Sequence, residues 1–203
     1  MAFRLLPVVE YSGQMRILRE IGITILIAIA IFALLRVTVQ AYTVRYSCMI
    51  PSIEEGEWLM VSKASYFFSD PERGDVIVFD PPVSSQFPYI KRVIGLPGET
   101  VEVRDEKVFI DGIPLAEEYI KEAPRYTMAP MAIPQGEYFV LGDNRNNAND
   151  SHAGWTVARE TIIGEAWFVY WPPNRWGPVE HYSYPELNQE VEAEAMLLGP
   201  IRR

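Results

Sequence analysis

The stretch ETVEVRDEKVFIDGIPL, residues 99–115, decides the fold class. Apolar residues alternate with polar ones on both sides of a charged centre, at Val101, Val103, Val108 and Ile110. A period of two is typical of a strand that buries one face. The polar segment Arg104–Glu106 between the two halves predicts a turn, so this stretch predicts an antiparallel hairpin.

Five other short stretches have the same character, because each is rich in β-branched and aromatic residues and bounded by Gly, Pro or Asp. They are EWLMVSKASYFF (57–68), GDVIVFDPP (74–82), YIKRVIG (89–95), GEYFVLGD (136–143) and GEAWFVYWPP (164–173). The proline-rich region 124–134 predicts a loop, and residues 185–198 predict a C-terminal helix that begins at Pro185. The body is therefore predicted to be mainly β.

A long apolar run precedes this body. Residues 21–35 form fifteen positions without a charge. As a helix they would span about 22 Å, less than the ~30 Å hydrocarbon core of a bilayer. Extending the helix to 17–40 gives enough length and places Arg19 and Arg36 near its ends, where long side chains reach the interface. We predict one N-terminal transmembrane helix.

Two alternatives to an anchor are the buried helix of a soluble protein and a cleaved secretory signal, for which Val39-Gln40-Ala41 has small residues at a suitable spacing. The long lead before the apolar run favours an uncleaved anchor, and its arginines weakly favour a cytoplasmic N-terminus. The predicted organisation is a short N-terminal segment (1–16), an anchor (17–40), an extracytoplasmic domain (41–180) and an acidic helical tail (181–203).

Composition excludes several function classes. The chain has 203 residues, a hydrophobic fraction of 49% and a net charge of -9. An acidic protein is a poor partner for nucleic acid, whose phosphates require a basic surface. A single cysteine allows neither an intrachain disulfide nor a cysteine-based zinc site, and the sequence implies no metal and no other cofactor.

Three stretches carry chemistry that a β core does not need: SCMIPS (47–52), YIKRVIGLPGETVEV (89–103) and LGDNRNNANDSHAGW (141–155). Lys91 lies among apolar residues, so it is either a solvated strand charge or a desolvated, neutral lysine that acts as a general base. The Asx-rich segment is typical of a hydrogen-bonded turn, and its spacing does not fit a calcium loop.

Together these stretches resemble the conserved boxes of the bacterial type I signal peptidases. The order is the same: anchor, nucleophile box, lysine box and Gly-Asp-Asn-Arg box. The resemblance covers roughly residues 20–175, and KRVIGLPGETVEV and GDNR followed by DS are its most specific parts. It implies an antiparallel β fold like that of signal peptidases and SOS-repressor autoproteases.

The resemblance also implies a function, which is the removal of signal peptides from exported preproteins by a Ser-Lys dyad. It implies a single-pass protein of the plasma membrane with an extracytoplasmic catalytic domain, and therefore signal peptides and the lipid bilayer as partners. Small residues are expected at the first and third positions before the cut. An SOS-type autoprotease is disfavoured, because residues 1–40 show an apolar span and no helix-turn-helix pattern.

The nucleophile box departs from the family pattern Ser-Met-x-Pro-Thr. Matching Met49 and Pro51 places Cys48 at the position of the nucleophilic serine, and Ser52 replaces the threonine. Tyr46 stands two positions before Cys48, where the family has Gly or Ser. In the third box, Ala148 stands where a serine often lies beside the lysine.

By resemblance, Cys48 is the nucleophile and Lys91 the general base. The Cys48 N–H and a hydroxyl of Ser47 or Ser52 are expected to bind the oxyanion. Asp143, Arg145 and Asp150 are expected to brace the site through ion pairs, with Arg92 as a partner. Asn144 is expected to belong to the same bracing set.

Three interpretations of Cys48 stay open. It is a working nucleophile, since a thiol loses its proton more readily than a hydroxyl, or it is a small buried residue in a decayed site. Alternatively, Ser47 is the nucleophile, which requires a local rearrangement because neighbouring side chains of an extended segment face opposite sides. A decayed site would leave a membrane-anchored protein that binds signal peptides without cleaving them.

Overall fold

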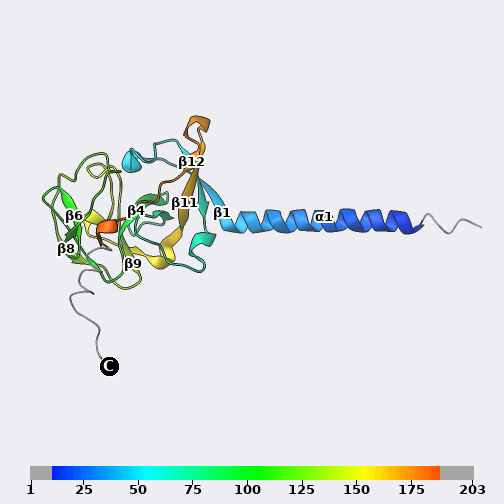
Figure 1. The fold of residues 1–203 in the computed structure, drawn as a ribbon, viewed down its shortest axis with the longest axis horizontal. Coiled ribbons are helices and arrows are strands. Elements are labelled where there is room, and N and C mark those ends of the chain that lie inside the picture. The colour runs from blue at the N-terminus through cyan, green and yellow to red at the C-terminus, as the bar shows by residue number, and fades with distance from the viewer. Residues whose placement is uncertain (1–10, 188–203) are drawn as a thin grey trace, which may run out of the picture. The chain divides into compact units, whose positions relative to one another are not determined.

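The structure is a computed structural model, and it describes residues 11–187 of the chain. The chain divides into two compact units, Met1–Val39 and Gln40–Arg203. Within the described residues, the first unit is one long helix and the second is a β body (Figure 1).

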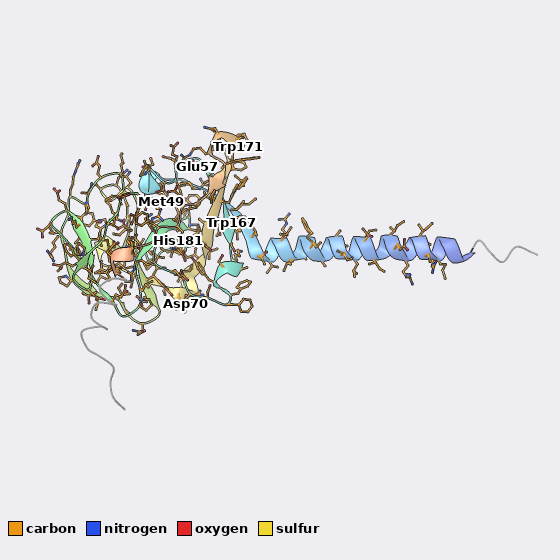
Figure 2. The ribbon with its side chains drawn as sticks, in the orientation of Figure 1. Met49, Glu57, Asp70, Trp167, Trp171 and His181 are labelled. Atoms are coloured by element: carbon orange, nitrogen blue, oxygen red, sulfur yellow. The ribbon has the colours of Figure 1, made fainter. Side chains whose placement is uncertain are left out.

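Helix α1 runs over Tyr11–Thr38. Its segment Met15–Thr38 has a mean hydropathy of 2.5 and no buried position, and it is long and apolar enough to cross a membrane. At 1.5 Å per residue these positions span about 36 Å. Figure 2 shows their side chains pointing outward along the helix. The helix ends at Thr38 because the residues that follow enter a strand.

An eight-stranded sheet forms most of the body, in the order β1-β2-β11-β3-β4-β9-β10, and β12 pairs with β11. Every pair in it with a defined register is antiparallel. The strands are β1 Val39–Thr43, β2 Trp58–Ser62, β3 Val76–Phe79, β4 Tyr89–Gly95, β9 Glu137–Leu141, β10 Val157–Ala158, β11 Ile162–Trp171 and β12 Gly177–Pro178.

A second, four-stranded sheet has the order β7-β6-β5-β8. Its strands are β5 Thr100–Arg104, β6 Lys107–Ile110, β7 Ile113–Pro114 and β8 Met128–Ala132. The predicted hairpin is confirmed, since β5 and β6 pair with Val103 opposite Val108. Its two-residue turn, Asp105 and Glu106, has positive φ at both positions, as type I′ hairpin turns require.

The prediction of a loop over 124–134 is wrong for Met128–Ala132, which forms β8. This strand pairs with β5 and lies at the end of the sheet order. An edge strand tolerates a proline, because the side of the strand that faces away from the ladder needs no N–H donor. Pro130 is exposed there, so its presence did not exclude a strand.

Three hydrophobic clusters fill the body, and the one that concerns the site contains Cys48, Met49, Ile53 and Val61. The short 3-10 helices that connect the strands are η1 Ser47–Met49, η2 Ala64–Tyr66, η3 Ser151–Ala153, η4 Arg159–Thr161 and η5 Pro173–Arg175. The predicted mainly antiparallel β fold with one N-terminal apolar helix is confirmed.

The C-terminal part of the described chain packs on the body. Tyr184 is part of a second hydrophobic cluster, and Tyr182 and Leu187 pack against it. The Tyr184 hydroxyl lies 2.6 Å from that of Tyr119. Most of the helix predicted over 185–198 lies outside the described residues.

Candidate active site

The structure brings Cys48 and Lys91 together. Lys91 Nζ donates a hydrogen bond to Cys48 Sγ at 2.9 Å and another to the Ile90 carbonyl at 2.8 Å. The exposed fractions of Lys91 and Cys48 are 3% and 6%. Lys91 lies in the middle of β4, which is hydrogen-bonded to β3 and β9 on either side. The amine is thus held by a central strand within reach of the thiol proton.

Cys48 is presented by the 3-10 helix η1. Tyr46 is extended and ends the incoming segment, and the chain then turns tightly over Ser47–Met49. Met49, labelled in Figure 2, is fully buried, and its carbonyl accepts a hydrogen bond from the Ile53 N–H at 2.9 Å. The buried Met49 therefore anchors the turn that carries the thiol.

The Gly-Asp-Asn-Arg segment fixes the same turn from the other side. The Asn144 N–H donates to the Cys48 carbonyl, and Asn144 Nδ2 donates to the Ser47 carbonyl, both at 3.0 Å. A Cβ at Gly142 would lie 2.5 Å from the Cys48 carbonyl oxygen. This close approach explains why a glycine precedes Asp143, a requirement that sequence reasoning had not drawn from the segment.

Arg92 and Asp143 form a fully buried, two-hydrogen-bond ion pair. Arg92 Nε lies 3.0 Å from Asp143 Oδ1, and Nη2 lies 2.8 Å from Oδ2. Burial lowers the pKa of Arg92, but the hydrogen bonds and charge of Asp143 outweigh it, so the pKa is raised. Ser52 Oγ also donates to Asp143, at 2.5 Å, so this hydroxyl proton is already engaged.

Arg145 pairs with a residue that sequence analysis missed. Its guanidinium donates two hydrogen bonds of 2.6 Å to Glu117, and both side chains are almost completely buried. Glu117 lies between β7 and β8 in an ordinary acidic stretch, so no local pattern marked it. The partner of Arg145 therefore lies outside the three boxes.

Asp150 holds the loop closed. It accepts a hydrogen bond from the Gly142 N–H at 2.9 Å, and its other oxygen lies 2.6 Å from His152 Nδ1. The hydrogen bond to Asp150 raises the pKa of His152, against a smaller opposing effect of burial. His152 also stacks on Tyr126, with ring centroids 4.4 Å apart.

Ala148, at the position where the family often has a serine, packs against the apolar cluster that contains Cys48. The Ile90 carbonyl is the second hydrogen-bond partner of the Lys91 amine. The asparagines of this loop contact other groups, namely Asn146 to the Ala123 carbonyl, Asn147 to Ser47 Oγ and Asn149 to Tyr89 Oη. A main-chain carbonyl thus orients the lysine without a hydroxyl at position 148.

The dyad lines a cleft of about 570 Å³ on the β body. Its apolar lining includes Val44, Leu59, Val78 and Ile90, and its polar lining includes Ser47, Asn147 and Asn149. Ser52 is absent from this lining. Among the residues that the structure describes, no group of three or more His, Cys, Asp or Glu side chains is arranged to hold a metal ion.

Residues 18–171 match the family model described as signal peptidase, peptidase S26. The chain belongs to this family. It is 46% identical over 143 residues to the probable signal peptidase I-1 of Synechocystis sp., covering 67% of this chain and 73% of the relative. It is 42% identical over 173 residues to the signal peptidase I of Leptolyngbya laminosa, covering 82% and 84%.

A crystal structure of a signal peptidase I from Enterococcus faecalis V583 is also similar, with 34% identity and a TM-score of 0.41 over 48% of this chain and 97% of that chain. The prediction of a signal peptidase I-like hydrolase with an N-terminal membrane anchor is confirmed at the level of the family, whose general activity is the removal of signal peptides. The chemical roles of Cys48, Lys91 and the bracing residues stay predictions.

Proposed function

We propose that this chain is a single-pass membrane endopeptidase that removes signal peptides from exported preproteins with Cys48 as nucleophile and Lys91 as general base. The observation that carries the proposal is the 2.9 Å contact between Lys91 Nζ and Cys48 Sγ. Both groups are almost completely buried and line the same cleft, so the amine lies within hydrogen-bond reach of the thiol proton.

In the first step, the Lys91 amine takes the Cys48 thiol proton and the sulfur attacks the carbonyl carbon before the cleavage site. A C–S bond forms and the carbonyl π electrons move to oxygen, giving a tetrahedral oxyanion. The C–N bond then breaks, and the leaving amine of the mature protein takes the proton from the Lys91 ammonium. The signal peptide is left as a thioester on Cys48.

In the second step, the neutral Lys91 amine takes a proton from water, and the resulting hydroxide attacks the thioester carbonyl. The C–S bond breaks, the signal peptide leaves with a new carboxyl group, and the Cys48 sulfur recovers the proton from Lys91. The same lysine therefore serves as base and acid in each half of the reaction.

The Cys48 N–H is one donor to the oxyanion. In a trans peptide unit the C=O and N–H point in opposite directions. Because the Ser47 carbonyl points to Asn144 Nδ2, the Cys48 N–H of the same peptide points away from Asn144. The first N–H groups of a helical turn have no partner within the turn, so this donor is available to substrate.

The cleft supports a substrate with small apolar side chains before the cut. Val44, Leu59, Val78 and Ile90 line it near the dyad, and an apolar pocket gains free energy from a buried methyl group. The family order of anchor and boxes supports a catalytic body outside the cytoplasm, attached to the plasma membrane.

The test is cleavage of a preprotein by the purified full-length protein in detergent, with the parent, Cys48→Ala and Lys91→Met compared. The parent is expected to cleave, and both variants are expected to be inactive. A parent that binds the signal peptide without cleaving it would establish the non-catalytic alternative. Full activity of Cys48→Ala would move the nucleophile to Ser47.

A further inference from the structure

We propose that Asn147 is a positioning residue that holds the Ser47 hydroxyl as the second hydrogen-bond donor to the oxyanion. The inference rests on the proposed function, because it requires the oxyanion formed when Cys48 attacks. It gives a role to a loop asparagine outside the proposed dyad and the bracing ion pairs.

Two other hydroxyl groups, those of Ser52 and Tyr46, are less suitable than Ser47 as the second hydrogen-bond donor to the oxyanion. The Ser52 proton is donated to Asp143 at 2.5 Å, and Ser52 does not line the cleft. Two positions before Cys48 stands Tyr46, which also lines the cleft, but its ring is 53% exposed and its hydroxyl lies at the end of a long side chain. Ser47 is the remaining hydroxyl beside Cys48, and it lines the same cleft as the dyad.

The contact with Asn147 leaves the Ser47 proton available. Asn147 Nδ2 donates to Ser47 Oγ at 3.2 Å. A hydroxyl has two acceptor lone pairs and one proton, so accepting this bond uses a lone pair and leaves the proton for another acceptor. A donor to the oxygen also polarises the O–H bond, which strengthens the hydrogen bond that the hydroxyl donates.

The loop holds Asn147 in place relative to the nucleophile turn. The Asn147 N–H donates to the Asn144 carbonyl at 2.9 Å, and Asn144 itself binds the carbonyls of Ser47 and Cys48. One short turn therefore fixes the backbone of η1 through Asn144 and the side chain of Ser47 through Asn147. A donor fixed in this way needs no reorganisation when charge develops on the substrate.

The neighbouring Asn146 provides a matched control. It lies in the same loop and is also exposed, but its side chain donates to the Ala123 carbonyl and accepts from the Arg125 N–H. Asn146 does not line the cleft. Loss of its two hydrogen bonds loosens the loop without changing the contact with Ser47.

The experiment measures kcat and KM for preprotein cleavage by the full-length protein in detergent. Ser47→Ala and Asn147→Ala are expected to lower kcat by about 10²-fold, the scale of losing one oxyanion donor, while KM changes little. Ser47→Thr keeps the hydroxyl and is expected to retain most of the activity. Asn146→Ala is expected to leave kcat unchanged, and thermal unfolding confirms that every variant is folded.

Two further variants separate positioning from a general loosening of the loop. In Asn147→Asp the carboxylate can only accept, so it takes the Ser47 proton away from the substrate, and kcat should fall at least as far as in Asn147→Ala. In the double variant Ser47→Ala/Asn147→Ala, the second change should add no further loss, because Asn147 acts through Ser47.

Several outcomes would overturn the proposal. These are an unchanged kcat in Ser47→Ala, an independent effect of Asn147→Ala in the Ser47→Ala background, or full activity of Asn147→Asp. A loss confined to Tyr46→Phe would assign the donor to the Tyr46 hydroxyl. If cleavage depends on Cys48 and none of these variants matters, only this inference fails; if the parent does not cleave, the proposed function fails with it.

Discussion

The two sides of the turn Ser47–Met49, which carries Cys48, differ in how fully their polar groups are paired. On the loop side, Arg92 and Asp143 share two hydrogen bonds, and Ser52 adds a third to the same carboxylate. On the cleft side, the hydrogen-bond acceptors of the Lys91 amine within residues 11–187 are Cys48 Sγ and the Ile90 carbonyl. A saturated buried network sets a rigid geometry, whereas groups that must exchange protons with substrate retain capacity for new bonds. In the proposed mechanism, the difference separates the residues that hold the site from Cys48 and Lys91, which react.

The largest expected effect on stability comes from removing the buried ion pair between Arg92 and Asp143. Arg92→Met leaves Asp143 as an unpaired charge in the interior, so it should lower the free energy of unfolding by about 3–5 kcal/mol. Chemical denaturation of the full-length protein in detergent measures it. The control is Arg104→Met, whose ion pairs with Glu102 and Asp105 are largely exposed, and no measurable change is expected. Equal stability of the two variants would show that the buried pair does not hold the site.

Gly142→Ala changes the place where the Gly-Asp-Asn-Arg segment packs against the backbone of Cys48. The added Cβ would lie 2.5 Å from the Cys48 carbonyl oxygen and 2.8 Å from Ala148 Cβ. Relieving this overlap should cost about 1–3 kcal/mol and should displace the thiol from Lys91, which lowers kcat. Gly177→Ala is the control, because no atom lies within 4 Å of a Cβ there. Normal cleavage by Gly142→Ala would mean that the turn tolerates movement.

Ala148→Ser is a smaller change, and it tests how well the Lys91 amine is oriented. The new hydroxyl would restore the residue that the family often has beside the lysine. Because the Ile90 carbonyl already accepts a hydrogen bond from the Lys91 amine at 2.8 Å, kcat should change little. A large gain in kcat would show that Lys91 is poorly oriented in the parent and that the main-chain carbonyl is an inadequate substitute.

The smallest expected effect is on how the free energy of unfolding depends on pH. The pKa of His152 is raised in the folded state by its hydrogen bond to Asp150. A raised pKa contributes stability that is fully present below the unfolded value, about 6.5, and is lost as pH rises through the folded value. The stability difference between the parent and His152→Gln should therefore be largest in mild acid and shrink in alkali. Unfolding at several pH values measures it, and a difference that grows with pH would contradict the assigned contact.

Some parts of the fold and the site could be predicted from the sequence, and others could not. The alternation of apolar and polar residues predicted the β5–β6 hairpin, because this pattern is local in the sequence. The order of the three boxes predicted that Cys48 and Lys91 lie in one site, because this order is shared within a family. The pairing of Arg145 with Glu117 has no such signal, since the two residues meet only through the tertiary fold. The β8 strand was missed because its proline is harmless only at a sheet edge.

The contact of Asn147 with Ser47 was equally invisible in the sequence. Every asparagine in the segment 146–149 fits an Asx-rich turn, and composition does not distinguish which one faces the cleft. Only the folded structure separates Asn147, which contacts Ser47, from Asn146, which contacts the segment around Ala123. The sequence could therefore predict that Cys48 and Lys91 lie together, but not which asparagine contacts Ser47.

The most direct test of Cys48 as the nucleophile measures cleavage activity against the fraction of Cys48 that is alkylated by iodoacetamide. Cys48 is the only cysteine in the chain, so mass spectrometry of the intact protein reports modification of this residue alone. If Cys48 is the nucleophile, activity falls in proportion to alkylation and reaches zero at full modification, and alkylation slows in Lys91→Met. Full alkylation with undiminished cleavage would contradict it.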